Sequence, residues 1–333
     1  MANKKLRRMT AALTIITLSL FAVTGCQINR SAAVINIGVL KGPTGIAAVR
    51  LMEQYELGNI EGNYKFHIFS TPDEVNAKII SGELDIAAVP TNAAAVLYNR
   101  TNGGIQVAAV HTLGTIYIIE NGNTIKTLAD LKGKKIAVSG QGATPEYALK
   151  YILTANGFDL TKDMQIEFKS EHAELATLLT AGTVSIGLLP EPNVTAVLMN
   201  NENARIALNM TDEWAKAAKL TNAEGSELTT GVMIVNKDFA QKNKAAFDKF
   251  LSDYEQSILY VNSNVAEAAA LCEKFGIIPK AAIAERAIPN CSITYIEGNE
   301  MKAAVQGYLA TLFGFNPQSV GGNMPDDEFY YSK

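Results

Sequence analysis

The sequence is poor in cysteine and histidine, and neither residue forms a metal or redox motif. Its 333 residues include three cysteines and three histidines. Three cysteines are too few for a disulfide scaffold, and the absence of any C-x-x-C pair excludes the redox and zinc classes that depend on it. His67, His111 and His172 lack the spacing of metal ligands, so we expect no protein metal site.

Positive charge is also scarce. The chain has 29 basic and 33 acidic residues, a formal net charge of −4. Nucleic acid as the main partner would require clustered positive charge, so we do not expect it. Hydrophobic residues make up 48% and charged residues 19%, which provides for a sizeable core and excludes intrinsic disorder. The length is typical of about two domains.

Catalytic motifs are missing as well. The sequence contains no G-x-S-x-G and no set of kinase motifs. Gly140-Gln141-Gly142 begins like a dinucleotide fingerprint, but Pro145 stands where the third glycine belongs. We therefore expect a protein that is not an enzyme and holds no cofactor.

The N-terminal segment combines positive charge with a short apolar run. Residues 1–25 carry four basic residues and no acidic one, and residues 9–23 are mostly apolar. A run of 15 residues is shorter than the roughly 20 that span a bilayer, and the pattern is typical of a secretory signal peptide. We predict a signal peptide over 1–25 and a polar tether over 26–33. The alternative is an uncleaved membrane anchor.

The end of this segment, Val23-Thr24-Gly25-Cys26, resembles the lipobox of bacterial lipoproteins. In that family the leader is cut before the cysteine, which is then lipidated. The resemblance implies a mature protein outside the cytoplasm, anchored to the cell membrane through Cys26. Removal of residues 1–25 would change the formal charge from −4 to −8, because that segment holds four basic residues and no acidic one.

Predicted strands alternate with predicted helices, which indicates an α/β fold with mostly parallel sheets. The predicted strands cover residues 34–40, 64–69, 85–89, 135–138, 165–168 and 184–188. The predicted helices cover residues 43–55, 72–81, 92–99, 145–156, 173–181 and 194–199.

The two halves of this series repeat at an offset of 100 residues. The matched residues stand at strand ends and helix starts, where backbone geometry limits the choice of residue. They pair Gly42 with Gly142, Thr44 with Thr144, Ser70 with Ser170, Glu74 with Glu174, Gly82 with Gly182, Ile86 with Ile186, and Pro90 with Pro190. The repeat predicts two lobes of similar topology.

The C-terminal third forms no third lobe. A strand over 232–235 and helices that open at Asn243 and cover 265–275 and 299–312 are expected to complete the first lobe. We predict a discontinuous lobe I from 34–112 and 232–333, and a lobe II from 113–231. The chain then crosses between lobes near 111–115 and 229–231.

Three segments resemble extracytoplasmic solute-binding proteins of ABC importers, of the nitrate/sulfonate/taurine and thiamine-precursor type. They are the lipobox, the turn Gly42-Pro43-Thr44-Gly45 and the segment LADLKGKKIAV at 128–138, and the turn at 182–192 is similar as well. The resemblance implies a type II periplasmic-binding fold with a ligand cleft between two lobes. It also implies a monomer that serves a bacterial permease and ATPase, but it does not specify the ligand.

Four predicted strand ends lead directly into helix starts. Ligands of open parallel sheets bind beyond the carboxyl ends of strands, and each helix start offers unpaired N–H groups to an acceptor or an anion. The candidate ligand contacts are Lys41, Gly42, Pro43, Thr44, Gly45, Thr91, Asn92, Gln141, Gly142, Ala143 and Thr144. In the alternative interpretation, the hydroxyls and amides cap their helices and the glycines form turns.

Two titratable residues complete the candidate site. Glu191 aligns with Thr91 in the repeat, so it should stand at a helix start that faces the cleft. Its carboxylate would either cap that helix or accept hydrogen bonds from an amino-bearing ligand, and it would repel nitrate or sulfate. His111, at a strand end near the first crossover, either binds ligand or serves the hinge.

Cys272 and Cys291 leave two interpretations open. In an exported protein such a pair suggests a disulfide. The alternative is two buried thiols, because free cysteine behaves as a small hydrophobic residue.

The sequence therefore predicts a receptor lipoprotein that captures a small organic molecule by hinge closure and delivers it to an ABC permease. One alternative is an enzyme on the same fold, similar to chorismate dehydratase, although the relatives of that enzyme are cytoplasmic. Another is a ligand-sensing partner of a membrane receptor.

Overall fold

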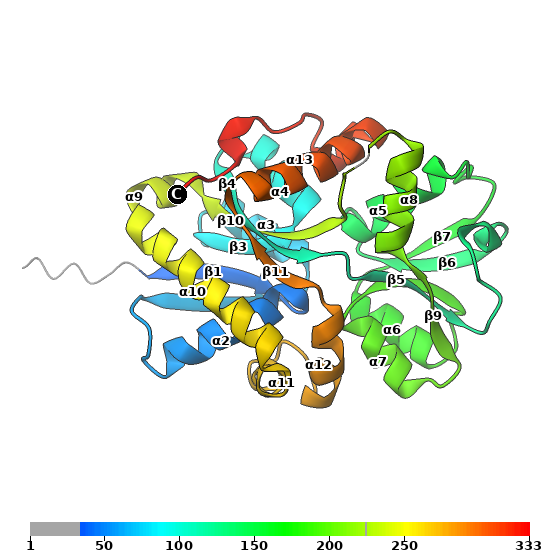
Figure 1. Cartoon of the computed structure of the whole chain (residues 1–333), viewed down its shortest axis with the longest axis horizontal. Helices are drawn as coiled ribbons and strands as arrows, with labels where there is room; N and C mark the ends of the chain where they lie inside the picture. Colours follow the sequence, from blue (N-terminus) through cyan, green and yellow to red (C-terminus); the bar gives the residue numbers. More distant parts are fainter. Residues whose placement is uncertain (1–33, 224) are drawn as a thin grey trace, which may run out of the picture. The chain divides into compact units, whose positions relative to one another are not determined.

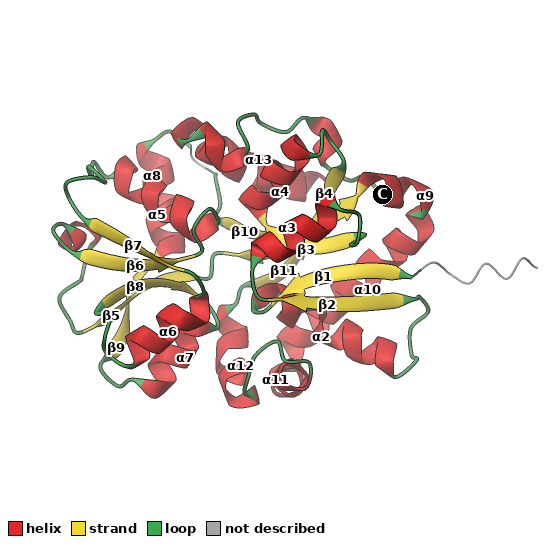
Figure 2. Ribbon diagram, turned by 180° about the vertical axis from the view of Figure 1, so that it is seen from behind, coloured by secondary structure: helices red, strands yellow, loops and turns green. Residues whose placement is uncertain are grey.

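The fold consists of two mixed sheets covered by helices on both faces (Figures 1 and 2). The structure is a computed structural model that describes residues 34–223 and 225–333. The predicted signal peptide, tether and Cys26 lie outside the described residues. No helix in the described part of the chain is long and apolar enough to cross a membrane.

Sheet A contains six strands taken from both ends of the described chain. In order across the sheet they are β11 (Ile293–Ile296), β4 (Ile105–Leu113), β10 (Thr229–Asn236), β3 (Ile86–Pro90), β1 (Ile35–Leu40) and β2 (Tyr64–Phe69). The strands β1, β2 and β3 are parallel, whereas β10 lies antiparallel between β3 and β4.

Sheet B contains five strands from the middle of the chain. In order they are β7 (Gln165–Lys169), β6 (Lys135–Ser139), β8 (Ile186–Pro190), β5 (Ile116–Asn121) and β9 (Ala204–Asn209). The strands β6, β7 and β8 are parallel, and β5 is antiparallel to both of its neighbours. The parallel arrangement expected from the sequence thus holds within each repeat, and the added strands make both sheets mixed.

The repeat at an offset of 100 is present in the structure. The order β1, β2, β3 with its helices recurs as β6, β7, β8 with theirs, and both triplets have the first strand in the middle. The helices of the first copy are α2 (Pro43–Glu56), α3 (Pro72–Ile80) and α4 (Thr91–Arg100), and those of the second are α5 (Thr144–Ala155), α6 (His172–Thr180) and α7 (Asn193–Asn200). Ser70 and Ser170 each donate a backbone N–H to the matching glutamate, Glu74 or Glu174, at 3.2 and 3.1 Å.

The chain passes from sheet A to sheet B between β4 and β5 and returns before β10. Gly114 and Thr115 separate β4 from β5, and both adopt positive φ angles, of 65° and 72°. The return runs from α8 (Met210–Leu220) to β10. The division into lobes at 112–113 and 231–232 remains a prediction.

The C-terminal third contributes helices to sheet A. They are α9 (Lys237–Lys242), α10 (Lys244–Ser263), α11 (Val265–Lys274), α12 (Ala281–Ala287) and α13 (Gly298–Phe315). The same part of the chain has short 3-10 turns at Ile288–Asn290, Pro317–Val320 and Asp327–Phe329, and a further one lies before β6 at Leu128–Leu131. Alternate residues of β3 face the two sides of the sheet: Ile86 and Ala88 pack with α2 and α10, and Ala87 and Val89 pack toward α4 and α13.

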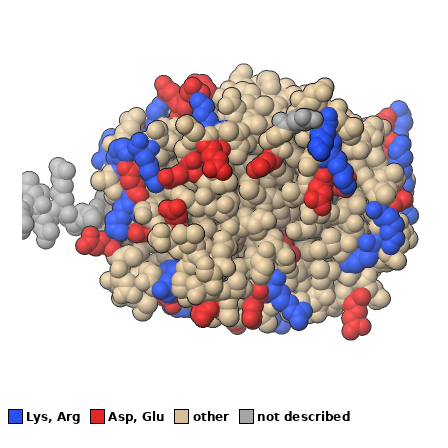
Figure 3. All heavy atoms as spheres, viewed as in Figure 1, with Lys and Arg blue, Asp and Glu red and all other residues tan. Residues whose placement is uncertain are grey.

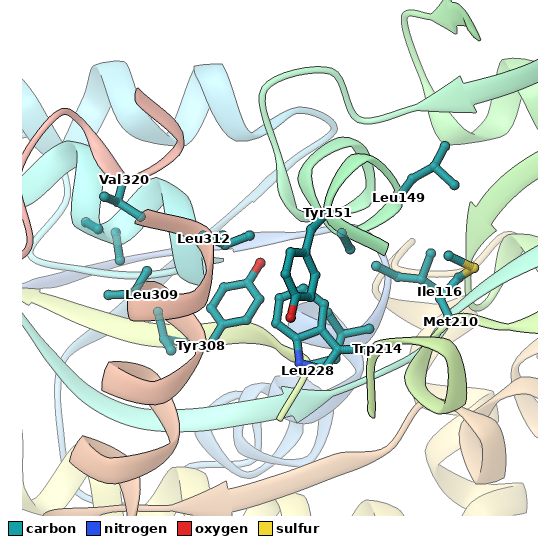
Figure 4. Packing of buried hydrophobic residues seen from close by; sticks show 14 of the residues in the cluster. Ile116, Leu149, Tyr151, Met210, Trp214, Leu228, Tyr308, Leu309, Leu312 and Val320 are labelled. Carbon is teal, nitrogen blue, oxygen red and sulfur yellow. The ribbon is translucent and has the colours of Figure 1, made fainter. Parts of the chain in front are cut away.

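A buried aromatic cluster joins α13 to the helices of sheet B (Figure 4). The ring of Trp214 in α8 lies 5.3 Å from that of Tyr308 in α13 and 4.7 Å from that of Tyr151 in α5. Trp214 and Tyr308 are 1% and 0% exposed. The only tryptophan of the sequence therefore serves packing between elements of the two sheets.

Candidate ligand cleft

A cleft of about 760 Å³ opens where the carboxyl ends of strands from both sheets meet. Of the thirteen candidate ligand contacts, nine line it and four do not. The nine are Lys41, Pro43, Thr44, His111, Gln141, Gly142, Ala143, Thr144 and Glu191, and the four are Gly42, Gly45, Thr91 and Asn92. The strand-end rule thus brings residues that lie far apart in the sequence to one cleft.

Several cleft residues were not among the sequence candidates. They include Ser70, Thr71, Asn76, Thr112, Thr115, Lys169, Ser170, Glu171, His172, Thr230 and Gly231. Residues 70–71 and 170–171 follow β2 and β7 at the same offset of 100, so the strand-end rule applied to every strand of the repeat would have found them.

The hydroxyl of Thr44 is bonded to its own strand. Its Oγ1 accepts from the backbone N–H of Leu40 and donates to the carbonyl of Leu40, both at 2.8 Å. These bonds close the turn between β1 and α2. Thr44 is 9% exposed, so it offers the cleft mainly its backbone.

Asn92 and Thr144 lie together in a buried network between α4 and α5. The Nδ2 of Asn92 donates to the carbonyl of Gly142 at 3.1 Å, and the Oγ1 of Thr144 donates to the Oδ1 of Asn92 at 3.3 Å. The hydroxyl of Tyr308 donates to Thr144 at 3.2 Å. All three side chains are at most 2% exposed, so the network ties the helix starts beside the two sheets to each other.

Glu191 is buried at the start of α7, where its carboxyl caps the helix. Oε2 accepts from the backbone N–H of Thr195 and Oε1 from its hydroxyl, both at 3.0 Å. The residue is 2% exposed, and burial raises the pKa of the carboxyl although the two hydrogen bonds act in the opposite direction. The capping role considered from the sequence is therefore present, and the carboxyl also borders the cleft.

Two neutral histidines face the cleft. Burial lowers the pKa of both His111 and His172 to about 4. The Nδ1 of His111 lies 2.7 Å from Oγ1 of Thr112, and the Nδ1 of His172 lies 2.7 Å from Oγ of Ser139. Both rings are uncharged near neutral pH, so they offer hydrogen bonds rather than charge.

The structure distinguishes between the two interpretations of the pair Cys272 and Cys291. Cys272 and Cys291 are both free and buried, so the disulfide considered from the sequence is corrected to two buried thiols. Burial raises the pKa of the Cys272 thiol to about 12. The two side chains belong to the core under α2 and α10.

Charges on the molecular surface are mixed in sign. On the face shown in Figure 3, basic side chains stand among acidic ones. Among the residues that the structure describes, no group of three or more His, Cys, Asp or Glu side chains is placed to hold a metal ion.

Comparisons with known structures show the fold. An ABC transporter protein from Parabacteroides distasonis is 27% identical, with a TM-score of 0.72 over 90% of this chain and 99% of that one. The periplasmic aliphatic sulphonate-binding protein SsuA from Escherichia coli is 20% identical, with a TM-score of 0.70 over 90% and 92%. The periplasmic nitrate-binding protein NrtA from Synechocystis PCC 6803 is 12% identical, with a TM-score of 0.62 over 86% and 82%. The fold is thus that of the type II periplasmic-binding proteins, as expected from the sequence.

The family follows from the sequence match. No curated protein matches the chain. The family described as the periplasmic substrate-binding protein of the phosphonate ABC transporter matches residues 59–278, more than half of the chain. This family and the structural neighbours are binding proteins of ABC importers and not enzymes, which confirms that part of the sequence prediction. The chain belongs to the family of periplasmic substrate-binding proteins of ABC transporters.

Proposed function

We propose that this protein is a lipid-anchored receptor that closes on a small organic solute and delivers it to an ABC permease. The observation that carries the proposal is the cleft of about 760 Å³, lined by strand ends of both sheets. Such a volume suits a small molecule. Closure is a hinge motion of lobe I (34–112 and 232–333) against lobe II (113–231) at the two crossovers, and the ligand shifts an open–closed equilibrium because it contacts both lobes.

A ligand that binds the folded protein alone is expected to stabilise it. At a concentration of 100 times Kd the gain in the free energy of unfolding is about 2.7 kcal/mol. A thermal-shift screen over sulfonates, nitrate, pyrimidines, flavins and aromatic acids measures this gain. The relatives named for sulphonate and nitrate make those two classes natural first members of the panel. Absence of any shift across the panel would count against the receptor function.

The anchor is expected to depend on a single thiol. Substitution Cys26→Ser removes the sulfur that would carry the lipid, so we expect complete loss of palmitate labelling in the bacterial host. The matched control is Cys272→Ser, which changes a buried thiol in the core and should leave labelling intact. Equal labelling of Cys26→Ser and the unsubstituted protein contradicts the lipid anchor.

A further inference from the structure

The helix starts around the cleft differ between the two copies of the repeat. In the second copy, the starts of α5 and α7 each have a carboxyl group that the starts of α2 and α4 lack, whereas α3 and α6 have the matching Glu74 and Glu174. The Oε2 of Glu146 accepts from the backbone N–H of Gly142 at 2.6 Å, and Glu191 caps α7 through Thr195. At the matching positions of the first copy the sequence has Ile46 and Thr91. The starts of α5 and α7, beside sheet B, could otherwise bind an anionic ligand, but a carboxyl group of the protein already lies at each of them.

The two carboxyl groups differ in how their charge is balanced. The Nζ of Lys150 lies 2.5 Å from Oε1 of Glu146 and balances the charge of that carboxylate. Among the described residues, no ion pair includes Glu191, and its carboxyl group accepts hydrogen bonds only from Thr195. A buried carboxylate without a cation is unfavourable, because burial removes water and nothing replaces its charge stabilisation. Glu191 therefore lacks a positively charged partner on a wall of the cleft.

Other polar atoms of the cleft wall also lack partners. The Oδ1 of Asn76 and the Nε2 of His111 are buried and form no hydrogen bond in the structure. An amide oxygen can only accept, so Asn76 requires a donor. His111 is 0% exposed and lines the cleft with Glu191. Asn76 thus favours a ligand that donates a hydrogen bond, whereas the Nε2 of His111 donates or accepts according to the tautomer of the ring.

We propose that the solute presents a protonated amine to Glu191, so that the receptor selects amino-bearing small molecules over simple oxoanions. An ammonium group would provide the positively charged partner that Glu191 lacks, together with up to three hydrogen-bond donors. A nitrate or alkyl sulfonate brought next to Glu191 would meet a like charge in a partly dry cleft. Lys41, Arg100 and Lys169 also line the cleft, and they can pair with an anionic group of the same amino-bearing solute. This inference rests on the proposed receptor function and adds to it the chemical class of the solute.

Matched pairs of compounds that differ by one amino group test the inference. Calorimetric titrations would compare taurine with ethanesulfonate, 2-aminoethylphosphonate with ethylphosphonate, and 4-(aminomethyl)benzoate with 4-methylbenzoate. We expect the amino member of at least one pair to bind ten or more times tighter than its partner. Equal or tighter binding of the partner in every pair that binds, or binding of no member of any pair, overturns the inference.

Substitution of the carboxyl group provides the second arm. Glu191→Gln keeps an acceptor for Thr195 but removes the charge, so we expect at least a tenfold loss of affinity for the amino member. We also expect a gain of affinity for ethanesulfonate, which a misfolded protein could not show. The matched control is Glu174→Gln, an exposed carboxyl that caps α6 through Ser170 and should leave the preference unchanged. An unchanged preference in Glu191→Gln overturns the inference.

Different results would contradict the proposed solute class and the receptor function. If des-amino oxoanions bind as well as their amino partners, the protein is still a receptor and only the proposed solute class is wrong. If no compound of the wider screen alters the melting temperature, the receptor function itself is contradicted.

Discussion

Replacement of Tyr308 by alanine is expected to lower the free energy of unfolding by about 3–5 kcal/mol, the usual loss for a large buried aromatic side chain. The ring is fully buried and packs on Trp214 at 5.3 Å, so its removal leaves a cavity between α13 and α8. The surrounding helices are anchored to different sheets, which limits how far they can collapse into the space. Equilibrium unfolding in urea, followed by far-UV circular dichroism, measures the loss.

The matched control is Tyr308→Phe. It keeps the ring and removes only the hydroxyl that donates to Thr144 at 3.2 Å, so the expected loss is about 1 kcal/mol. Fluorescence gives an independent readout, because Trp214 is the only tryptophan and its indole borders the cavity. We expect a red-shifted emission in the folded alanine variant. Loss of less than 1 kcal/mol in Tyr308→Ala would mean that the cluster does not join the two sets of helices.

The second large effect is expected for Glu120→Ala in β5, with a loss of about 3 kcal/mol at neutral pH. The carboxyl of Glu120 is 2% exposed. It accepts from the N–H and hydroxyl of Thr124 at 2.7 and 2.6 Å, and from Arg205 at 2.6 Å. Alanine leaves these donors, and the partly buried guanidinium, without their acceptor.

The stabilisation by Glu120 should depend on pH. Burial alone would raise the pKa of the carboxyl, but hydrogen bonds from Thr124, Ile125 and Arg205 outweigh burial and lower the pKa below 4.5. A depressed pKa in the folded state stabilises the protein above the pKa of the unfolded state, and this contribution disappears as pH falls through the folded value. The difference in urea midpoint between the unsubstituted protein and Glu120→Ala should therefore shrink below about pH 4.

The control for this experiment is Glu167→Gln, which removes the pairs of a carboxylate with 39% side-chain exposure with Lys135 and Lys169 in the same sheet. Exposed ion pairs contribute little, so its urea midpoint should stay close to that of the unsubstituted protein. A difference for Glu120→Ala that is constant from neutral to acidic pH would contradict an ionised Glu120 as its cause.

The sequence predicted the repeated part of the fold well because local geometry constrains residue choice there. Gly82 and Gly182 follow their helices with φ angles of 76° and 72°, and Ser70 and Ser170 form the same bond to a glutamate. Such positions can be predicted from the spacing of residues in the sequence alone. The strands β4, β5, β9 and β11 lie outside the repeat, so no matching segment 100 residues away supports them, and the sequence predicts the bounds of none of them.

The candidate site was harder to predict from the sequence, because tertiary contacts determine which polar groups remain free to bind a ligand. Thr44 and Asn92 have polar side chains that could contact a ligand. In the structure, however, the Thr44 hydroxyl is hydrogen-bonded to Leu40, and the Asn92 amide is hydrogen-bonded to Gly142 and Thr144. The partner of Asn92 lies 50 or more residues away, and no local pattern encodes that pairing. Glu191 was identified only through its alignment with Thr91 in the repeat.

The position of β10 in sheet A has a consequence for the order of folding. This strand lies between β3 and β4, yet it enters the chain only at Thr229, after the whole of sheet B. During synthesis the first 113 residues therefore emerge without the strand that joins β4 to β3, whereas sheet B is continuous in sequence. Sheet B can assemble first, and the earlier strands must wait, with unpaired edges, for a segment made more than 100 residues later. An export or holding factor that acts on the unfolded chain would find its most persistent target in those N-terminal strands.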